Sequence, residues 1–294
     1  MSVLKQDLSE EAKFEAVYWM TLLFKERGQR PSAEILTQAL TAAFGSADLV
    51  ADVEGEGALT SFALPEHLVT YADEQKVPAQ VLMADFAPFD PNSIDDLAQS
   101  QLWDQPDGPA LLEGCAYQLM ISDFMAAGLD YPERCQVLTT WLETALGLFE
   151  DCAAVWVPAS GKLLTRQQVL DNPMQDGDRF IYWAVNARFF NVDGSGDKVV
   201  DTLGLYAIGL PDVQYHFKGL DPDDVVGHAY STASYIFANH APIASGETID
   251  GLWEGRIDPE VRWRCQYEMA LIQPAREVMD ICPGPYAAGG RQPE

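Results

Sequence analysis

A chain of 294 residues, 48% hydrophobic and 21% charged, can form one large domain or two of about 100 to 150 residues, and it is apolar enough to fold without disulfide staples. Its formal net charge of −27 repels nucleic-acid phosphates and anionic lipid surfaces, so neither is an expected partner.

The start of the chain and its cysteines indicate the compartment. The segment "MSVLKQDLSEEAKFEAVYWM" has no basic region followed by an apolar run, so it does not have the pattern of a signal peptide, and no apolar stretch approaches the roughly 18 residues of a membrane span. The five cysteines are scattered, odd in number and without a CxxC motif, which is typical of free thiols in a reducing cytosol. We expect a soluble cytoplasmic protein.

The negative charge is unevenly distributed along the sequence. Residues 31–133 contain 18 acidic residues and a single base, Lys76, which leaves this segment at −17. Two interpretations stay open: the acidity keeps the protein soluble, or it forms a surface for a basic partner whose association it accelerates.

The residue pattern of the first half predicts a mixture of helices and strands. Helical spacing of apolar residues predicts helices over 10–27, with Ser9 as N-cap, and over 32–44. Short β-branched and apolar runs between 49 and 88 predict an antiparallel meander. Further on, the pattern predicts a short helix at 90–103, a strand at 115–125, a long helix at 131–149 and a strand at 152–158. This order resembles a ferredoxin-like unit.

The second half repeats this mixture. Strands are predicted over 179–192, 199–210 and 213–217, then a helix over 222–239 capped by Asp221, and closing strands over 247–254 and 262–273. The predicted fold class is α+β, with two ferredoxin-like or related halves and antiparallel sheet packed as one compact body. The halves are 1–157 and 158–283, followed by a disordered tail over 284–294 that is rich in glycine and proline.

Three segments carry a family resemblance. "TLGLYAIGLPDVQY", "GHAYSTASYIFANHAPIASGETIDG" and "CQYEMALIQP" resemble the C-terminal part of the bacterial family called domain of unknown function 4261. The first half is also similar, with Trp103 after an acidic helix, then a strand, a long helix and "AAVWVP"; the resemblance spans 58–281. The family has no established catalytic motif to carry over, and the resemblance is compatible with a role beside contact-delivered toxins in bacteria.

Three of the four histidines fall between residues 215 and 240, which raises the question of a site. His228 and His240 would lie about 18 Å apart along one helix, so they cannot share a metal ion. His216, Asp224 and His228 form an alternative polar site, because Asp224 and His228 share a helix face and His216 ends the preceding strand. Such a group would serve proton transfer or hold a divalent cation. An ordinary intrahelical pair explains Asp224 and His228 equally well.

No catalytic residue, metal site or cofactor is predicted from any other motif. Tryptophan beside arginine, as in Trp253, Arg256 and Trp263, has the composition of an interface hot spot, although arginines also protect edge strands. These three residues, with Asp95, Asp96, Asp104 and Asp107, are the predicted partner-binding set.

The leading hypothesis is a non-enzymatic acidic binding protein, an immunity protein that neutralises a basic bacterial toxin. The alternatives are an enzyme or metal-dependent module centred on His216, Asp224 and His228, or a structural partner in a larger assembly. The oligomeric state stays open.

Overall fold

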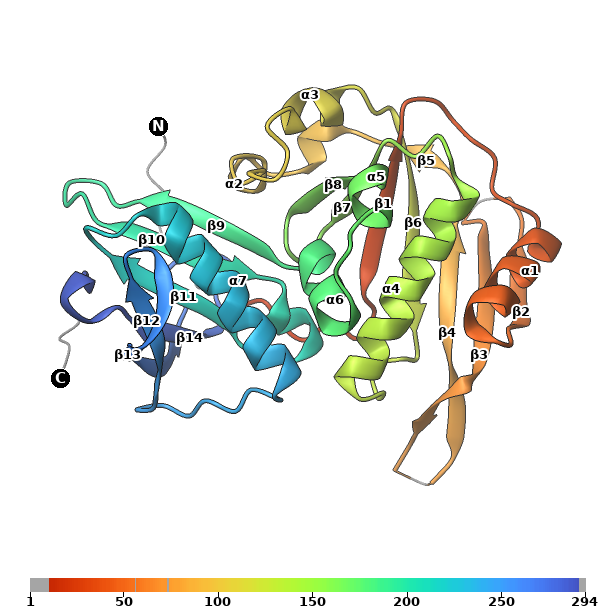
Figure 1. Cartoon of the computed structure of the whole chain (residues 1–294). Helices are drawn as coiled ribbons and strands as arrows, with labels where there is room; N and C mark the ends of the chain where they lie inside the picture. Colours follow the sequence, from red (N-terminus) through yellow and green to blue (C-terminus); the bar gives the residue numbers. More distant parts are fainter. Residues whose placement is uncertain (1–10, 56, 73, 291–294) are drawn as a thin grey trace. The chain divides into compact units, whose positions relative to one another are not determined.

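The computed structural model describes residues 11–55, 57–72 and 74–290. It is an α+β protein with two sheets rich in antiparallel pairs, as predicted (Figure 1). Contacts divide the chain into an N-terminal unit, Glu15–Ala184, and a C-terminal unit made of the described residues 11–14 and 185–290. The division follows Ala184 rather than residue 157, because the strand and helices after residue 157 pack with the first sheet.

The N-terminal unit is built on an eight-stranded sheet in which every pair of neighbours is antiparallel. The order is β2-β3-β4-β6-β1-β7-β8, with the short β5 paired to β6. The strands are β1 (Trp19–Phe24), β2 (Asp48–Val53), β3 (Leu59–Thr70), β4 (Lys76–Ala84), β5 (Ala87–Pro88), β6 (Tyr117–Phe124), β7 (Ala154–Val157) and β8 (Lys162–Thr165).

The helices of this unit follow their local signals. The first begins at Ser32, whose side chain accepts a hydrogen bond from the Ile35 amide, and it stops at Gly45, where φ is +80°. The predicted helix over 90–103 is split, because Asp90 and Asp95 each cap a separate short turn. The elements are α1 (Ala33–Phe44), η1 (Pro91–Ser93), α2 (Asp96–Gln99), α3 (Gly108–Glu113), α4 (Tyr131–Leu148), α5 (Arg166–Leu170) and α6 (Asp176–Ala184).

The core of the N-terminal unit has a ferredoxin-like arrangement, but its first strand and first helix are β1 and α1 and not the elements predicted between residues 49 and 103. In chain order β1, α1, β4, β6, α4 and β7 form it, and β4, β6, β1 and β7 are neighbours in that order in the sheet. Helices α1 and α4 contact each other and the sheet (Figure 1). The unit extends this arrangement by β2 and β3 at one edge and β8 at the other.

The prediction of a helix over 10–27 is wrong in its described part; Ser9 and Glu10 lie outside the described residues. Trp19–Phe24 is the central strand β1, hydrogen-bonded to β6 on one side and to β7 on the other. All of its residues except Trp19 are buried. A short apolar run buried on both faces suits a central strand as well as a helix, and pairing with distant strands decides between them.

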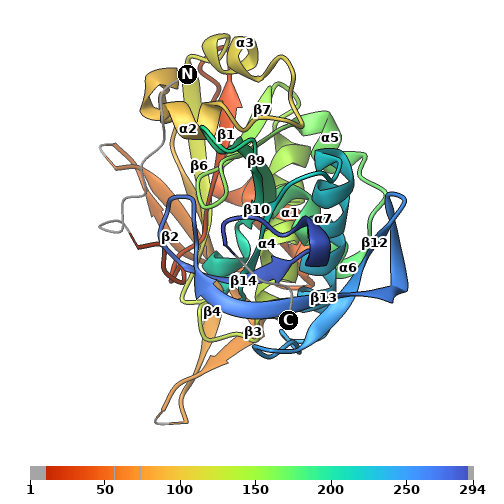
Figure 2. The ribbon, with the colours of Figure 1, turned by 90° about the vertical axis from the view of Figure 1, so that its left-hand side faces the viewer.

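The C-terminal unit has a six-stranded sheet in the order β12-β13-β14-β11-β10-β9, in which only β11 and β14 are parallel. Two three-stranded meanders are joined by α7, which packs over β9, β10 and β11, so this unit does not repeat the ferredoxin-like arrangement. The long β13 stands out in Figure 2. The elements are β9 (Asn186–Asn191), β10 (Lys198–Leu203), η2 (Leu205–Ile208), β11 (Asp212–Phe217), α7 (Pro222–Ala238), β12 (Thr248–Trp253), β13 (Arg256–Met269), β14 (Glu277–Cys282) and η3 (Gly284–Tyr286).

Two predictions about the second half are corrected. The strand predicted over 179–192 is the end of α6 followed by β9, because Phe180, Ile181 and Trp183 are buried on helix α6. The tail predicted as disordered contains η3 and a bridge between Phe217 and Ala287; residues 291–294 lie outside the described part.

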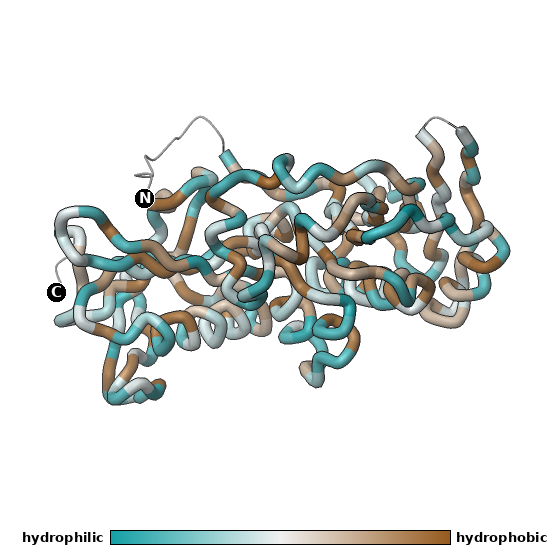
Figure 3. Tube along the Cα trace, turned by 90° about the horizontal axis from the view of Figure 1, so that it is seen from above, coloured by the Kyte–Doolittle hydropathy of each residue, from teal (hydrophilic) through white to brown (hydrophobic). Residues whose placement is uncertain are grey.

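The state of the cysteines and the hydropathy of the helices can be read from the structure. All five cysteines are free thiols, and four of them are buried. Among the described residues, no helix is both long and apolar enough to cross a membrane. Short hydrophobic and hydrophilic stretches are interspersed along the chain (Figure 3).

Candidate functional site

The acidic segment 31–133 lies within the N-terminal unit and turns most of its charge outward. Of its described acidic side chains, only Asp123 is buried, and Asp85 and Glu133 are half-buried. Asp123 is neutralised by Arg134, with 2.6 Å between the Oδ2 and Nε atoms. The remainder of this charge faces solvent.

All four predicted aspartates are exposed and belong to the α2–α3 region, and Asp95, Asp96 and Asp107 share one role. Asp95 caps α2, since its Oδ1 accepts a hydrogen bond of 2.8 Å from the Ala98 amide, and Asp96 lies in the first turn. Asp107 precedes α3 without a capping hydrogen bond from its side chain. None of the three forms an ion pair with a described residue.

Asp104 has a different role. Its Oδ2 lies 2.6 Å from Nζ of Lys162, a lysine on β8 whose side chain is only 3% exposed. An ammonium group that is buried to this degree needs a partner of opposite charge, so Asp104 stabilises the fold.

Sequence reasoning did not select the residue beside it as a binding residue. Trp103 is 54% exposed, although the adjacent Leu102 packs into a core cluster with Trp156 and Leu163. The indole Nε1 donates a 3.0 Å hydrogen bond to Gln101 Oε1. An exposed tryptophan held on a packed segment, in the same region as the exposed carboxylates of Asp95, Asp96 and Asp107, has the composition of an interface hot spot. The signal in the sequence that could have selected Trp103 is a tryptophan within an acidic stretch of weak helical periodicity.

The aromatic part of the predicted set divides in two. Trp253 is 61% exposed and faces Arg256 across the β12–β13 turn, so both are accessible. Trp263 is 1% exposed and its ring centroid lies 4.8 Å from that of His228, so it is a core residue and not a contact for a partner. Gly251 of β12 leaves room for this indole ring, since a Cβ at that position would lie 2.5 Å from Trp263 Nε1.

The alternative site of His216, Asp224 and His228 does not converge. The Tyr215 hydroxyl lies 2.7 Å from His228 Nδ1, so Tyr215 faces α7 and the next residue, His216, faces the other side of the sheet. There His216 Nε2 lies 3.5 Å from Asp197 Oδ2. Asp224 lies against the β12–β13 turn, where a Cβ at Gly255 would be 2.8 Å from Asp224 Oδ2.

His228 instead joins α7 to the edge strand β12. Its Nε2 lies 2.8 Å from the Asp250 carbonyl, which can only accept, so Nε2 carries the proton and Nδ1 accepts from the Tyr215 hydroxyl. Burial lowers the pKa of His228 and raises the pKa of Tyr215, which keeps the imidazole neutral and the phenol protonated. The pair is a structural connection in which every polar atom is satisfied.

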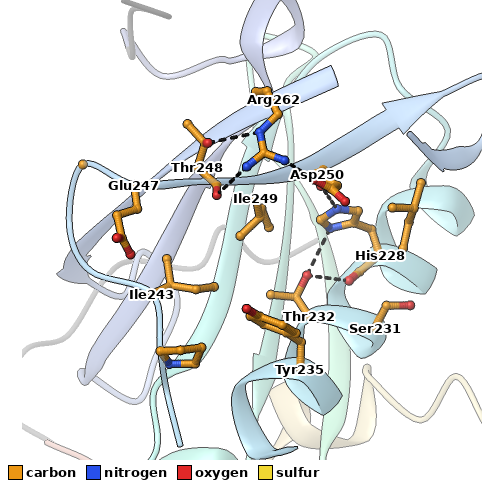
Figure 4. Close-up of a pocket in the computed structure, with 13 residues that line it drawn as sticks. His228, Ser231, Thr232, Tyr235, Ile243, Glu247, Thr248, Ile249, Asp250 and Arg262 are labelled. Atoms are coloured by element: carbon orange, nitrogen blue, oxygen red, sulfur yellow. Dashed lines mark hydrogen bonds and ion pairs between the residues drawn. The ribbon is translucent and has the colours of Figure 1, made fainter. Parts of the chain in front are cut away.

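A pocket of about 790 Å³ opens beside this connection, between α7, the loop that follows it, and the β12–β13 hairpin (Figure 4). Its walls include His228 and Tyr235 from α7, Ile243 and Glu247 from the loop, Ile249 from β12 and Arg262 from β13. The guanidinium of Arg262 is already engaged, with Nε 3.2 Å from Thr248 Oγ1 and Nη1 paired with Asp250.

A buried ion network in the C-terminal unit was also missed by sequence reasoning. Asp201 accepts from Arg188 Nη2 at 2.6 Å and from Arg276 Nη2 at 2.9 Å, and Arg276 Nε also lies 3.2 Å from Asp212. Burial by itself lowers the pKa of Arg276, but the carboxylates of Asp201 and Asp212 outweigh burial and raise this pKa. Two arginines and two aspartates balance in charge, which is typical of a structural network.

No group of three or more His, Cys, Asp or Glu side chains within the described ranges is placed to hold a metal ion. No curated protein and no solved structure matches the chain. The family model described as domain of unknown function (DUF4261) matches residues 201–282, which confirms the predicted resemblance for the C-terminal unit; the match does not include the rest of the predicted span from residue 58. Over residues 201–282, the chain is therefore similar to the DUF4261 family.

Proposed function

We propose that this chain is a non-enzymatic acidic binding protein of the bacterial cytosol, and that its partner is a basic protein. One observation carries the proposal: between residues 31 and 133 nearly all the described carboxylates face solvent, with a single base, Lys76, in the segment. An immunity protein that neutralises a basic toxin is the role that we propose for it.

The α2–α3 region is the proposed contact surface. Asp95, Asp96 and Asp107 supply charge that attracts a basic partner, and Trp103 supplies apolar area next to them. Charges of this kind raise the association rate, whereas a buried aromatic anchor mainly sets the dissociation rate. Mutations in the two groups should therefore have separable kinetic effects.

The test is the binding kinetics of the basic protein that copurifies with the full chain, once mass spectrometry has identified it. The triple variant Asp95→Asn, Asp96→Asn and Asp107→Asn should slow association severalfold at low salt and little at high salt. Asp104 is left intact, because its loss would remove the ion pair with the buried Lys162. Trp103→Ala should mainly speed dissociation.

A matched control changes the same amount of charge elsewhere. Asp223→Asn, Glu254→Gln and Glu260→Gln neutralise three exposed acids of the C-terminal unit. Under the proposal this control associates faster than the α2–α3 variant. Equal association rates for the two triple variants would mean that only total charge matters, and the proposed surface would be rejected.

A further inference from the structure

We propose that the pocket between α7 and β12 binds an organic cation, that is, an apolar body carrying one ammonium or guanidinium group. The pocket lies within the C-terminal unit and in the segment that matches the family. The inference goes beyond the proposed function, because it holds whether or not the acidic α2–α3 surface binds a protein.

The charge of the lining favours a cation. Arg262 is paired with Asp250 and also donates to the Thr248 hydroxyl and carbonyl, so these two ions neutralise each other. Glu247 remains; its Oε2 accepts a 2.7 Å hydrogen bond from the Ala244 amide, and no described Lys, Arg or His forms an ion pair with it. The lining therefore keeps one uncompensated negative charge.

A hydroxyl group of α7 adds an acceptor. Ser231 Oγ, which is exposed, donates its proton to the Gly227 carbonyl at 2.9 Å and so has only lone pairs left to offer. The buried Thr232 hydroxyl is engaged by the His228 carbonyl at 2.9 Å and the Tyr215 hydroxyl at 3.3 Å. His228 contributes no positive charge, because both ring nitrogens are satisfied in the neutral form. A ligand rich in hydrogen-bond donors suits these walls.

The remaining walls are apolar or aromatic. Ile243 and Ile249 line the pocket together with Tyr235, a residue that is 49% exposed (Figure 4). Aliphatic side chains bury an apolar body, and an aromatic face attracts a cation when it lies within about 6 Å. A volume of about 790 Å³ is within the range of small-molecule pockets.

Two sources provide this chemistry: a free amine, or a lysine or arginine side chain of a peptide. The experiment measures the affinity of the full chain by calorimetry or NMR titration for 4-phenylbutylamine and for its neutral counterpart 4-phenylbutanol. A second arm compares acetyl-Leu-Lys-Leu-amide with acetyl-Leu-Gln-Leu-amide. Whichever cationic probe binds more tightly indicates the source.

We expect the amine to bind about tenfold more tightly than the alcohol, as one charge-assisted hydrogen bond allows. Glu247→Gln should abolish this preference, since the amide oxygen still accepts from Ala244 while the charge is gone. Glu260→Gln, an exposed acid of β13 outside the pocket lining, should preserve it. Equal binding of each cationic probe and its neutral counterpart in both arms, binding of no probe at millimolar concentration, or an unchanged preference in a folded Glu247→Gln variant would overturn the proposal.

Discussion

At the scale of single residues, His228 couples folding to pH. Its pKa is lowered by burial, so the folded state binds fewer protons than the unfolded state near and below the ordinary pKa of about 6.5. Stability therefore rises with pH across this range and is lost as pH falls through it. We expect the free energy of unfolding to fall between pH 8 and about 5.5, and to fall less in His228→Gln.

Urea denaturation at the two pH values checks this, with His67→Gln as control. His67 pairs with Glu133 in the N-terminal unit, so that variant should keep the contribution of His228. Identical pH dependence in wild type and His228→Gln would show that the pKa of His228 is the same in the folded and the unfolded state.

Arg276 is the residue on which the buried ion network depends most. It bonds to both Asp201 and Asp212 and is 2% exposed, so Arg276→Met would leave two carboxylates with fewer donors in the core. Breaking a buried pair in this way costs about 3–5 kcal/mol of unfolding free energy. Arg264→Met, at an exposed position of β13, should change it by less than about 0.5 kcal/mol. Chemical denaturation of both variants measures the difference, and a similar small loss in each would contradict the network's importance.

At the scale of elements, a central strand and an edge strand of the N-terminal sheet should differ in how well their amides are protected from hydrogen exchange. Strand β1 is bonded on both sides and buried, whereas β2 is an edge strand on which Leu49, Val50 and Val53 are each about half exposed. Local opening is cheap where few contacts must break. We predict that hydrogen exchange of the amides in β1 requires global unfolding, while those of β2 exchange much faster.

Exchange followed by mass spectrometry on peptides covering residues 19–24 and 48–53 tests this prediction. The strand β6, also central, serves as the internal reference for β1. Rapid exchange across 19–24 would be incompatible with a central position of this segment.

At the scale of the whole molecule, the net charge of −27 acts against compactness. Salt screens the repulsion between exposed carboxylates, so raising NaCl from low concentration to about 0.3 M should raise the urea midpoint. KCl should act equally, since screening does not depend on the cation. The Asp95, Asp96 and Asp107 triple variant should show a smaller rise. A midpoint that is independent of salt would mean that paired charges offset the repulsion in the folded state.

The sequence alone determined features that depend on near neighbours. Helices α1, α4 and α7 were predicted within about two residues, because Ser32, Asp221 and the apolar spacing of 131–149 act within one or two turns. The acidity of 31–133 and the free thiols likewise follow from composition and spacing.

Only the tertiary structure decided what depends on distant pairing. Whether Trp19–Phe24 is a helix or a strand depended on β6 and β7, which lie about 100 or more residues away in the chain. The burial of Trp263, the pairing of Asp104 with Lys162 and the separation of His216 from His228 arise in the same way. Residue types and spacing indicated which residues could form a site. The face of a sheet on which a side chain lies, and the residue with which a charge pairs, are set by contacts that local sequence does not encode.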